Sequence, residues 1–360
     1  MKKATKWLAI VLCLALIVTA FAACGGKDTG DTTTSAGETT SADQTTTAAK
    51  EELVTKEIPA DKVYNVGISQ LVQHPALDEA TKGFKERLTE LMGEAHVKFD
   101  EQNAANNTDT CSTIANSFVS KKVDLILANA TPALTAAMAA TPTIPIVGTS
   151  ITDYATALKI DLDKWKGHTE INVTGSSDLA PLDQQADMLM TLIPNAKTVG
   201  IIYCSGEANS KYQVDVVTKC LEEKNITVKV YPFADSNDVQ AITTKAVAEC
   251  DAIYIPTDNT AADSAEIINN IAEPAKKPII AGEEGICKGC GVATLTISYY
   301  DIGVAAANQA YDILVNGKDP AEMDISFADK FEKKYVKSRA EALGIEIPSD
   351  YKEIVVEAAK

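Results

Sequence analysis

The stretch VYNVGISQLVQHPALDEATKGFKERLTELMG, residues 63–93, shows the structural unit that recurs through the chain. Residues 63–69 form a short, mainly apolar run, which predicts a β-strand. In residues 75–92 the apolar side chains recur one helical turn apart, at Leu77, Ala80, Phe84, Leu88 and Leu91. This spacing predicts a helix with one buried face. Pro75 suits the first turn of that helix, and Gly93 suits the residue that ends it.

The same alternation continues along the chain. Further strand candidates are the apolar runs at 97–99, 123–129, 144–149, 171–175, 199–204, 226–232, 252–256, 278–282 and 292–298. Several of these runs are apolar at nearly every position, as parallel strands buried on both faces are. Amphipathic helical patterns fill the intervals between them. The alternation predicts an α/β protein built on open, doubly wound parallel sheets.

The body of the chain, of about 300 residues, exceeds what one hydrophobic core usually serves, so we expect two domains. One unit covers 62–170, and a second begins near Pro181. In open α/β sheets, ligands bind beyond the carboxyl ends of the strands. Two such sheets facing each other would surround one cleft with these loops. The pattern therefore predicts a hinged binding protein.

The N-terminus has the features of an export sequence. Three lysines, Lys2, Lys3 and Lys6, precede the uncharged apolar run 7–23. This pattern predicts a signal peptide over residues 1–23 rather than a membrane-spanning helix. The residues FAAC that end at Cys24 resemble the lipobox of bacterial lipoproteins. The resemblance implies that Cys24 becomes the lipidated N-terminus; an ordinary secreted protein cut nearby remains the alternative.

Residues 24–60 are predicted to be a tether behind the lipidated cysteine. They consist largely of Thr, Ser, Gly, Ala and Asp, a composition that buries too little surface to fold. A flexible coil of this length reaches about 30–35 Å. We therefore expect a lipid-anchored body on the outer face of the cytoplasmic membrane.

Composition excludes several classes of function. The formal charge of −17 argues against nucleic acid and anionic lipid as direct partners of the body. Only Arg87 and Arg339 offer guanidinium groups, and the three histidines, His74, His96 and His168, are far apart in sequence. Phosphate-gripping and metal-binding sites usually need more of both residue types. Because no G-x-S-x-G, H-E-x-x-H or P-loop motif is present, we expect no metal, no cofactor and no enzymatic activity.

Seven stretches, in chain order, resemble the tryptophan/tyrosine-type family of ABC-transporter substrate-binding lipoproteins. They are GISQLVQHPALDEATKGF (67–84), DLILANATPA (124–133), INVTGSSDLAPLDQQ (171–185), YIPTDNTAADSA (254–265), PIIAGEEGICKGC (278–290), ISYYDIG (297–303) and AEALGIEIP (340–348). The resemblance implies a type I periplasmic-binding-protein architecture, in which a hinge with crossovers joins two lobes. It also implies delivery of a small molecule to an ABC permease in the membrane.

This architecture implies lobes that are discontinuous in sequence. The N-terminal α/β lobe would comprise 61–172 and 299–325, and the C-terminal α/β lobe 173–298 and 326–360. We expect the protein to be a monomer.

Polar residues near the predicted strand ends are candidates for ligand contact. In the N-terminal lobe they are Ser69, Gln70, Thr131, Thr149 and Ser150. In the C-terminal lobe they are Ser176, Asp178, Glu207, Asn209, Asp258, Asn259 and Glu283, and Tyr299 lies where the chain returns to the N-terminal lobe. Turn, capping and packing roles remain open for most of them. His74, at a helix start that attracts a carboxylate, could either contact ligand or cap the helix.

Asp258 is the strongest candidate because it follows a buried strand and precedes a helix. A carboxylate in a closed cleft needs a positive partner, which the ammonium of an amino acid would supply. The alternative is a helix cap.

The pair Cys287 and Cys290 has the C-x-x-C spacing but runs through glycines into a β-like stretch. With no helix expected to begin at Cys287 and no second ligand pair, redox and metal roles are disfavoured. We expect a local hairpin disulfide or two free thiols.

The sequence thus predicts a binding lipoprotein of an ABC importer, with an aromatic or other apolar amino acid as ligand. The alternatives are another small uncharged metabolite, and a surface receptor or adhesin that uses the same fold without transport.

Overall fold

The computed structural model describes residues 54–356. The predicted signal peptide, Cys24 and most of the tether lie outside these residues. Within 54–356, no helix is long and apolar enough to cross a membrane.

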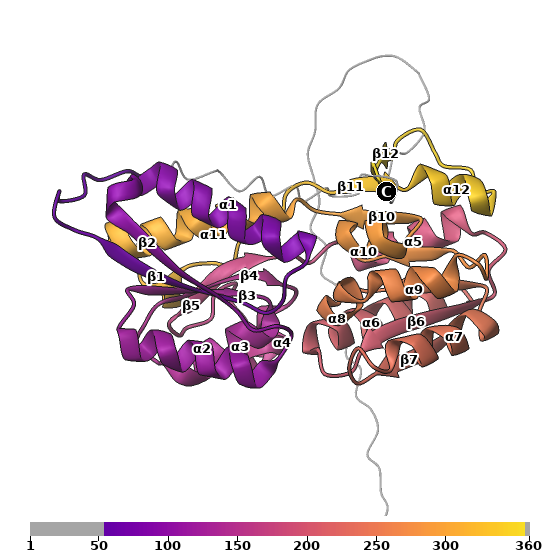
Figure 1. The fold of residues 1–360 in the computed structure, drawn as a ribbon, viewed down its shortest axis with the longest axis horizontal. Helices are drawn as coiled ribbons and strands as arrows, with labels where there is room; N and C mark the ends of the chain where they lie inside the picture. The colour runs from indigo at the N-terminus through magenta and orange to yellow at the C-terminus, as the bar shows by residue number, and fades with distance from the viewer. Residues whose placement is uncertain (1–53, 357–360) are drawn as a thin grey trace, which may run out of the picture. The chain divides into compact units, whose positions relative to one another are not determined.

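The first sheet has five strands in the order β2-β1-β3-β4-β5, and all its pairs are parallel. The strands are β1 (Tyr64–Gln70), β2 (Val97–Asn103), β3 (Leu125–Asn129), β4 (Ile146–Ile151) and β5 (Val173–Ser177). The helices around it are α1 (Pro75–Met92), α2 (Thr108–Lys121), α3 (Thr131–Ala140), α4 (Tyr154–Leu158) and α11 (Tyr299–Tyr311). Helices α1 and α11 cover one face, and α2 and α3 cover the other (Figure 1).

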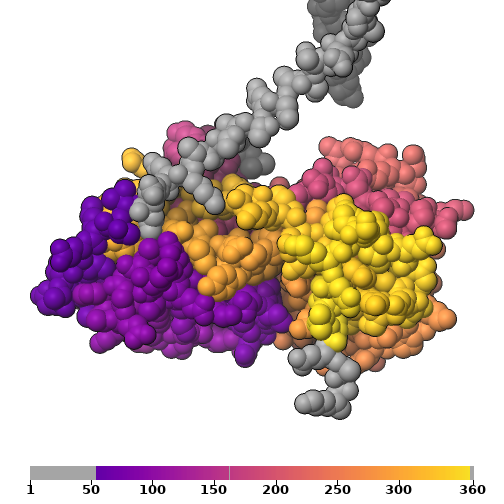
Figure 2. Space-filling model, turned by 90° about the horizontal axis from the view of Figure 1, so that it is seen from above, coloured from indigo at the N-terminus to yellow at the C-terminus, as the bar shows by residue number. Residues whose placement is uncertain are grey.

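Two glycines bring α11 against α1. A Cβ atom on Gly83 would lie 2.2 Å from the carbonyl oxygen of Tyr300, and one on Gly303 would lie 2.1 Å from that of Ala80. The two backbones can meet only because neither residue has a side chain. Residues near 300 accordingly lie among those of the N-terminal part of the chain in Figure 2.

The second sheet has seven strands in the order β12-β11-β10-β9-β8-β6-β7. They are β6 (Thr198–Cys204), β7 (Thr227–Phe233), β8 (Ala252–Ile255), β9 (Ile279–Ala281), β10 (Ala293–Thr296), β11 (Glu332–Tyr335) and β12 (Lys352–Glu353). Strand β11 runs antiparallel to β10, which departs from the all-parallel prediction. Since β11 follows the last crossover, it enters the sheet from the opposite end.

Helices pack on both faces of this sheet. One face carries α7 (Val239–Glu249), α8 (Asn259–Asp263), α9 (Ala265–Ala272) and α10 (Glu284–Cys290). The other carries α5 (Leu182–Leu192), α6 (Ala208–Glu222) and α12 (Lys337–Leu343). The remaining short helical turns are Glu94–His96, Leu162–Lys164, Asp312–Asn316 and Pro320–Glu322.

The chain crosses between the sheets at 178–181, 297–298 and 327–331. The predicted α/β class with two lobes is confirmed. The predicted lobe boundary before residue 173 differs from the sheet order, because β5 pairs with β4 in the first sheet, with Val173 opposite Ile146. The crossover therefore follows β5 instead of preceding it.

Candidate functional site

A cavity of about 260 Å³, opening included, lies beyond the carboxyl ends of strands from both sheets. Its lining residues are His74, Leu77, Ser150, Asp178, Asn209, Thr257, Asp258, Asn259, Ala262, Glu283 and Tyr299. The segments that follow β1, β5, β6, β8, β9 and β10 each contribute to this lining. This is the location that the sheet topology predicts for a ligand.

Seven of the candidate residues line this cavity: Ser150, Asp178, Asn209, Asp258, Asn259, Glu283 and Tyr299. His74, for which two roles were open, also lines it, as do Leu77, Thr257 and Ala262, which were not among the candidates. Two features of the sequence could have indicated such a role. Thr257 directly precedes Asp258, and Leu77 lies in the first turn of α1.

The other candidates do not line the cavity. They are Ser69, Gln70, Thr131, Thr149, Ser176 and Glu207. Gln70 accepts a hydrogen bond from Thr81 Oγ1 at 2.6 Å and donates to Asp78. Ser176 Oγ donates to Thr149 Oγ1 at 3.1 Å and to the carbonyl of Ile302 at 2.9 Å. Gln70 and Ser176 thus hydrogen-bond within the first lobe, whereas Ser69 Oγ is buried and has no hydrogen-bond partner among the described residues.

The predicted strand 144–149 ended at Thr149, whereas β4 continues to Ile151, so that both Thr149 and Ser150 lie inside it. Its pairing with β5 shifts register between Gly148 and Ile151, and Ser150 has a φ of 57°, in the left-handed region. Such irregularities re-aim a side chain at a strand end. Here Ser150 lines the cavity while its neighbour Thr149 faces the interior.

Asp258 is the N-cap of α8. Its Oδ1 accepts from the N–H of Ala261 at 2.8 Å, and its Oδ2 accepts from the N–H of Cys204 at 2.6 Å. The capping role left open by the sequence is therefore present. Burial, and then the neighbouring Glu207, raise the pKa of this carboxyl.

Two other carboxyl groups line the same cavity. Asp178 accepts from Thr152 Oγ1 and from the Tyr299 hydroxyl, each at 3.0 Å. Burial raises the pKa of Asp178 to about 6, although these hydrogen bonds oppose the rise. Glu283 caps α10 by accepting from the N–H groups of Gly285 and Ile286, and burial raises its pKa as well.

The lining combines three carboxyl groups with a single basic side chain, His74, and contains no lysine or arginine. The proximity of His74 lowers the pKa of both Asp178 and Glu283, against the effect of burial. The cavity is therefore suited to a ligand that brings a positive charge.

Three lining atoms are buried and have no hydrogen-bond partner within residues 54–356: Ser150 Oγ, Asn209 Oδ1 and His74 Nδ1. Buried polar groups are nearly always paired. Because all three atoms line the same cavity, they are available to form hydrogen bonds with a ligand.

The C-x-x-C pair was expected outside a helix, but Cys287 and Cys290 lie in the second half of α10. Both are free, buried thiols whose pKa values burial raises. Because a reactive thiol needs a lowered pKa and access, their surroundings do not favour redox chemistry.

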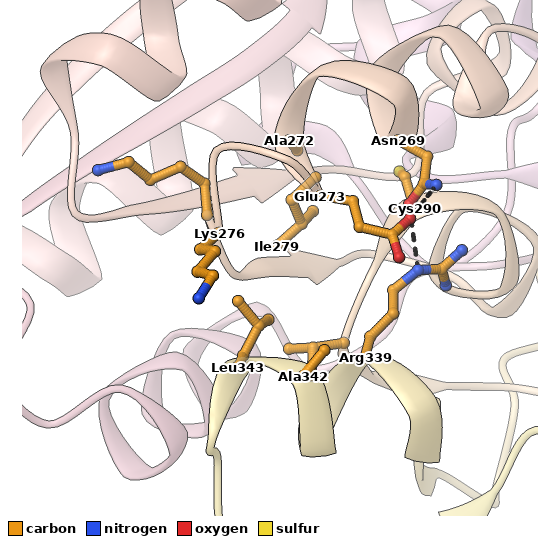
Figure 3. A pocket seen from close by; sticks show the side chains of 11 residues that line it. Asn269, Ala272, Glu273, Lys276, Ile279, Cys290, Arg339, Ala342 and Leu343 are labelled. Carbon is orange, nitrogen blue, oxygen red and sulfur yellow. Dashed lines mark hydrogen bonds between the residues drawn. The ribbon is translucent and has the colours of Figure 1, made fainter.

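A larger cavity, of about 470 Å³ with its opening, lies in the second lobe between α9 and α12 (Figure 3). Arg339 lines it, but its guanidinium donates to the carbonyls of Cys287, Gly289 and Gly291 and to Asn269 Oδ1. The Nζ of Lys277 donates to the carbonyl of Cys250. Since Arg339 and Lys277 already have partners, these two cations are less available to a ligand than the unpartnered polar atoms of the smaller cavity.

Comparison with known proteins agrees with this geometry. The family described as ABC transporter substrate binding protein matches residues 65–360. A tyrosine-binding protein of Clostridioides difficile is 38% identical over 280 residues, which cover 77% of this chain and 80% of that protein.

Solved structures give the same match. An ABC domain from Streptococcus pneumonia in complex with L-Trp is 30% identical, with a TM-score of 0.77, covering 82% of this chain and 100% of that one. The ligand-free, open structure of a substrate-binding protein with adhesive properties from Clostridium difficile is 34% identical, with a TM-score of 0.63 over 82% of this chain and all of that one.

Proposed function

Because this chain belongs to the ABC transporter substrate-binding protein family, we propose that it binds an aromatic α-amino acid as a zwitterion in the cavity between its lobes. The electronegative lining, together with unpartnered polar atoms, carries this proposal. The ligands in the names of its relatives, tyrosine and L-Trp, agree with it.

The ammonium group of the ligand would face the carboxyl groups. Asn209 Oδ1 is a buried acceptor without a partner, and Asp178 lines the same cavity. An ammonium group is a donor only, so it satisfies both. A charge-assisted hydrogen bond of this kind contributes about 1.5–3 kcal/mol.

The carboxylate of the ligand would face donors from the first lobe. Ser150 Oγ is buried and unpartnered, and the cavity is also lined at Leu77, in the first turn of the 18-residue α1. The free N–H groups and the dipole at a helix start favour an anion.

The ring would lie against Tyr299, Leu77 and Ala262, the less polar part of the lining. Aromatic stacking on Tyr299 would favour tyrosine or tryptophan over an aliphatic side chain.

We further propose that the protein acts without catalysis as a monomer. It would be held by Cys24 on the outer face of the cytoplasmic membrane and would present its ligand to a permease. Support comes from the FAAC sequence and from the family.

Titration calorimetry on the soluble body tests the ligand. L-Tyrosine or L-tryptophan should bind, whereas tryptamine, which lacks the carboxylate, and indole-3-propionate, which lacks the ammonium, should bind at least about tenfold more weakly. L-Leucine distinguishes an aromatic from a general apolar preference. Failure of both aromatic amino acids to bind contradicts the proposal.

Adhesion is a second candidate, because one similar structure is of a protein with adhesive properties. Host-surface binding that persists in a variant defective in ligand binding would support it as an additional function.

A further inference from the structure

Glu207, a predicted ligand contact, instead faces the start of α8. Its Oε2 accepts from the backbone N–H and the Nδ2 of Asn259, at 3.0 and 2.7 Å. Its Oε1 accepts from the backbone N–H and the hydroxyl of Thr260, at 2.9 and 2.8 Å. Asn209 Nδ2 adds a further donor at 3.1 Å. All of these residues belong to the second lobe, so the cluster does not depend on contact with the first lobe.

Two of the residues held by Glu207, Asn259 and Thr260, also form hydrogen bonds with the first lobe. His74 Nε2 lies 3.2 Å from Asn259 Oδ1, and Asn106 Nδ2 donates to Thr260 Oγ1 at 3.0 Å. Both hydrogen bonds join one lobe to the other. They must break when the lobes separate, whereas the bonds to Glu207 need not.

Glu207 also sets the direction of both bonds. Every group in contact with its oxygens is a donor, so the Asn259 amide must turn its Nδ2 toward Glu207 and its Oδ1 toward His74. An amide oxygen only accepts, and His74 Nε2 therefore donates. In the same way the Thr260 hydroxyl gives its proton to Glu207 and keeps its lone pairs for Asn106.

We propose that Glu207 is a positioning residue for lobe closure, which orients Asn259 and Thr260 to receive His74 and Asn106 from the opposite lobe. We call the two hydrogen bonds between the lobes, His74 to Asn259 and Asn106 to Thr260, the latch. His74 links this latch to the ligand, because its Nδ1 is buried, has no hydrogen-bond partner and belongs to the cavity lining. The link to the ligand rests on the proposed function; the latch itself does not.

The first test is a double-mutant cycle in which stopped-flow fluorescence measures the rate at which L-tyrosine dissociates. Glu207→Gln places an amide donor where only acceptors fit, so one latch residue must turn away. We expect dissociation to become about tenfold faster. In a His74→Ala, Asn106→Ala background the same change should have less than about a twofold effect. Equal effects in both backgrounds would show that Glu207 does not act through the latch.

Asp251→Asn is the matched control. Asp251 also accepts backbone N–H groups, those of Lys197 and Thr198, but it does so at the amino end of β6, away from the cavity. Its substitution should lower the melting temperature without changing the dissociation rate. If Glu207→Gln behaves like this control, its role is structural only.

Small-angle scattering without added ligand separates the latch from the proposed function. Both Glu207→Gln and the His74→Ala, Asn106→Ala variant should have a larger radius of gyration than the unaltered protein. The His74→Ala, Asn106→Ala variant leaves the hydrogen bonds of Glu207 intact, so it still tests the latch if Glu207→Gln fails to fold. An unchanged radius in the folded variants, both without ligand and with saturating L-tyrosine, overturns the latch. Failure of the unaltered protein to bind either aromatic amino acid overturns only the proposed function.

Discussion

Substitution of Asp178 tests most directly whether the cavity binds the ammonium group of a ligand. Asp178 is buried, and its hydrogen bonds come from Thr152 and Tyr299, which are both neutral. Asp178→Asn keeps the shape of the side chain but removes the charge that would face an ammonium group. We expect affinity for L-tyrosine to fall about tenfold to a hundredfold in titration calorimetry.

The control is Asp183→Asn, an exposed residue in the first turn of α5. It should leave affinity unchanged. If the two variants bind alike, the ammonium group does not lie beside Asp178.

The pKa of Asp178 predicts how binding varies with pH. Burial raises this pKa from 3.8 to about 6, so the folded protein disfavours the ionised form. The contribution of Asp178 to stability is therefore fully present below its unfolded pKa and is lost as pH rises through about 6. An ammonium group reverses this preference, so binding below about pH 6 must release a proton and become weaker as pH falls.

Calorimetry at about pH 5.5 in two buffers with different ionisation enthalpies measures this proton release. The apparent binding enthalpy should differ between buffers, and the difference should shrink in Asp178→Asn. Identical enthalpies in both buffers for the unaltered protein would contradict the prediction.

Among the elements, the contact between α1 and α11 carries the clearest stability prediction. Glycine in a helix interior is normally less stable than alanine, by about 1 kcal/mol. Gly303→Ala should nevertheless destabilise the protein by about 1–3 kcal/mol, because the new Cβ would lie 2.1 Å from the Ala80 carbonyl oxygen.

Chemical denaturation followed by circular dichroism gives the free energy of unfolding. The comparison variant is Ala305→Gly, at a half-buried position of the same helix, which should lose only about 1 kcal/mol. A stabilising Gly303→Ala would mean that α1 and α11 can separate at no cost.

Helix α10 shows where the sequence is insufficient. The stretch 284–290 contains two glycines, and its local pattern predicts a loop that leads into a strand. The helix is supported from outside: Glu283 caps its start, and Arg339, some 50 residues later, donates to the carbonyls at its end. No local pattern contains that second contact.

The strands were more predictable, because their apolar runs are continuous; the run at 252–256 became β8, Ala252–Ile255. The site was predictable at the level of loops, since ligand loops follow strand ends. Which side chains of these loops face the cavity was less predictable. Whether Gln70 or Glu207 faces the cavity depends on partners such as Thr81 and Thr260, which the sequence does not place beside them.

For the whole molecule, the proposed anchor and the binding body should be separable. Cys24→Ser should abolish labelling by radioactive fatty acid while leaving the affinity for L-tyrosine unchanged, because the cavity is built from residues 74–299. The control is Cys220→Ser, a partly exposed thiol of α6, which should still be labelled. Continued labelling of the Cys24→Ser protein would contradict lipidation at this residue.

The order of the segments in the chain also constrains how the protein can be made. The first sheet is complete once β5 has been synthesised, yet one of its faces is covered in part by α11, which comes more than a hundred residues later, after most of the second lobe. During synthesis the N-terminal lobe therefore exposes the apolar surface that Ala306, Ala307 and Ala310 later bury. It cannot reach its final stability until the ribosome has finished most of the chain. If the proposed signal peptide directs secretion, this late completion would keep the nascent chain competent for export in an unfolded state.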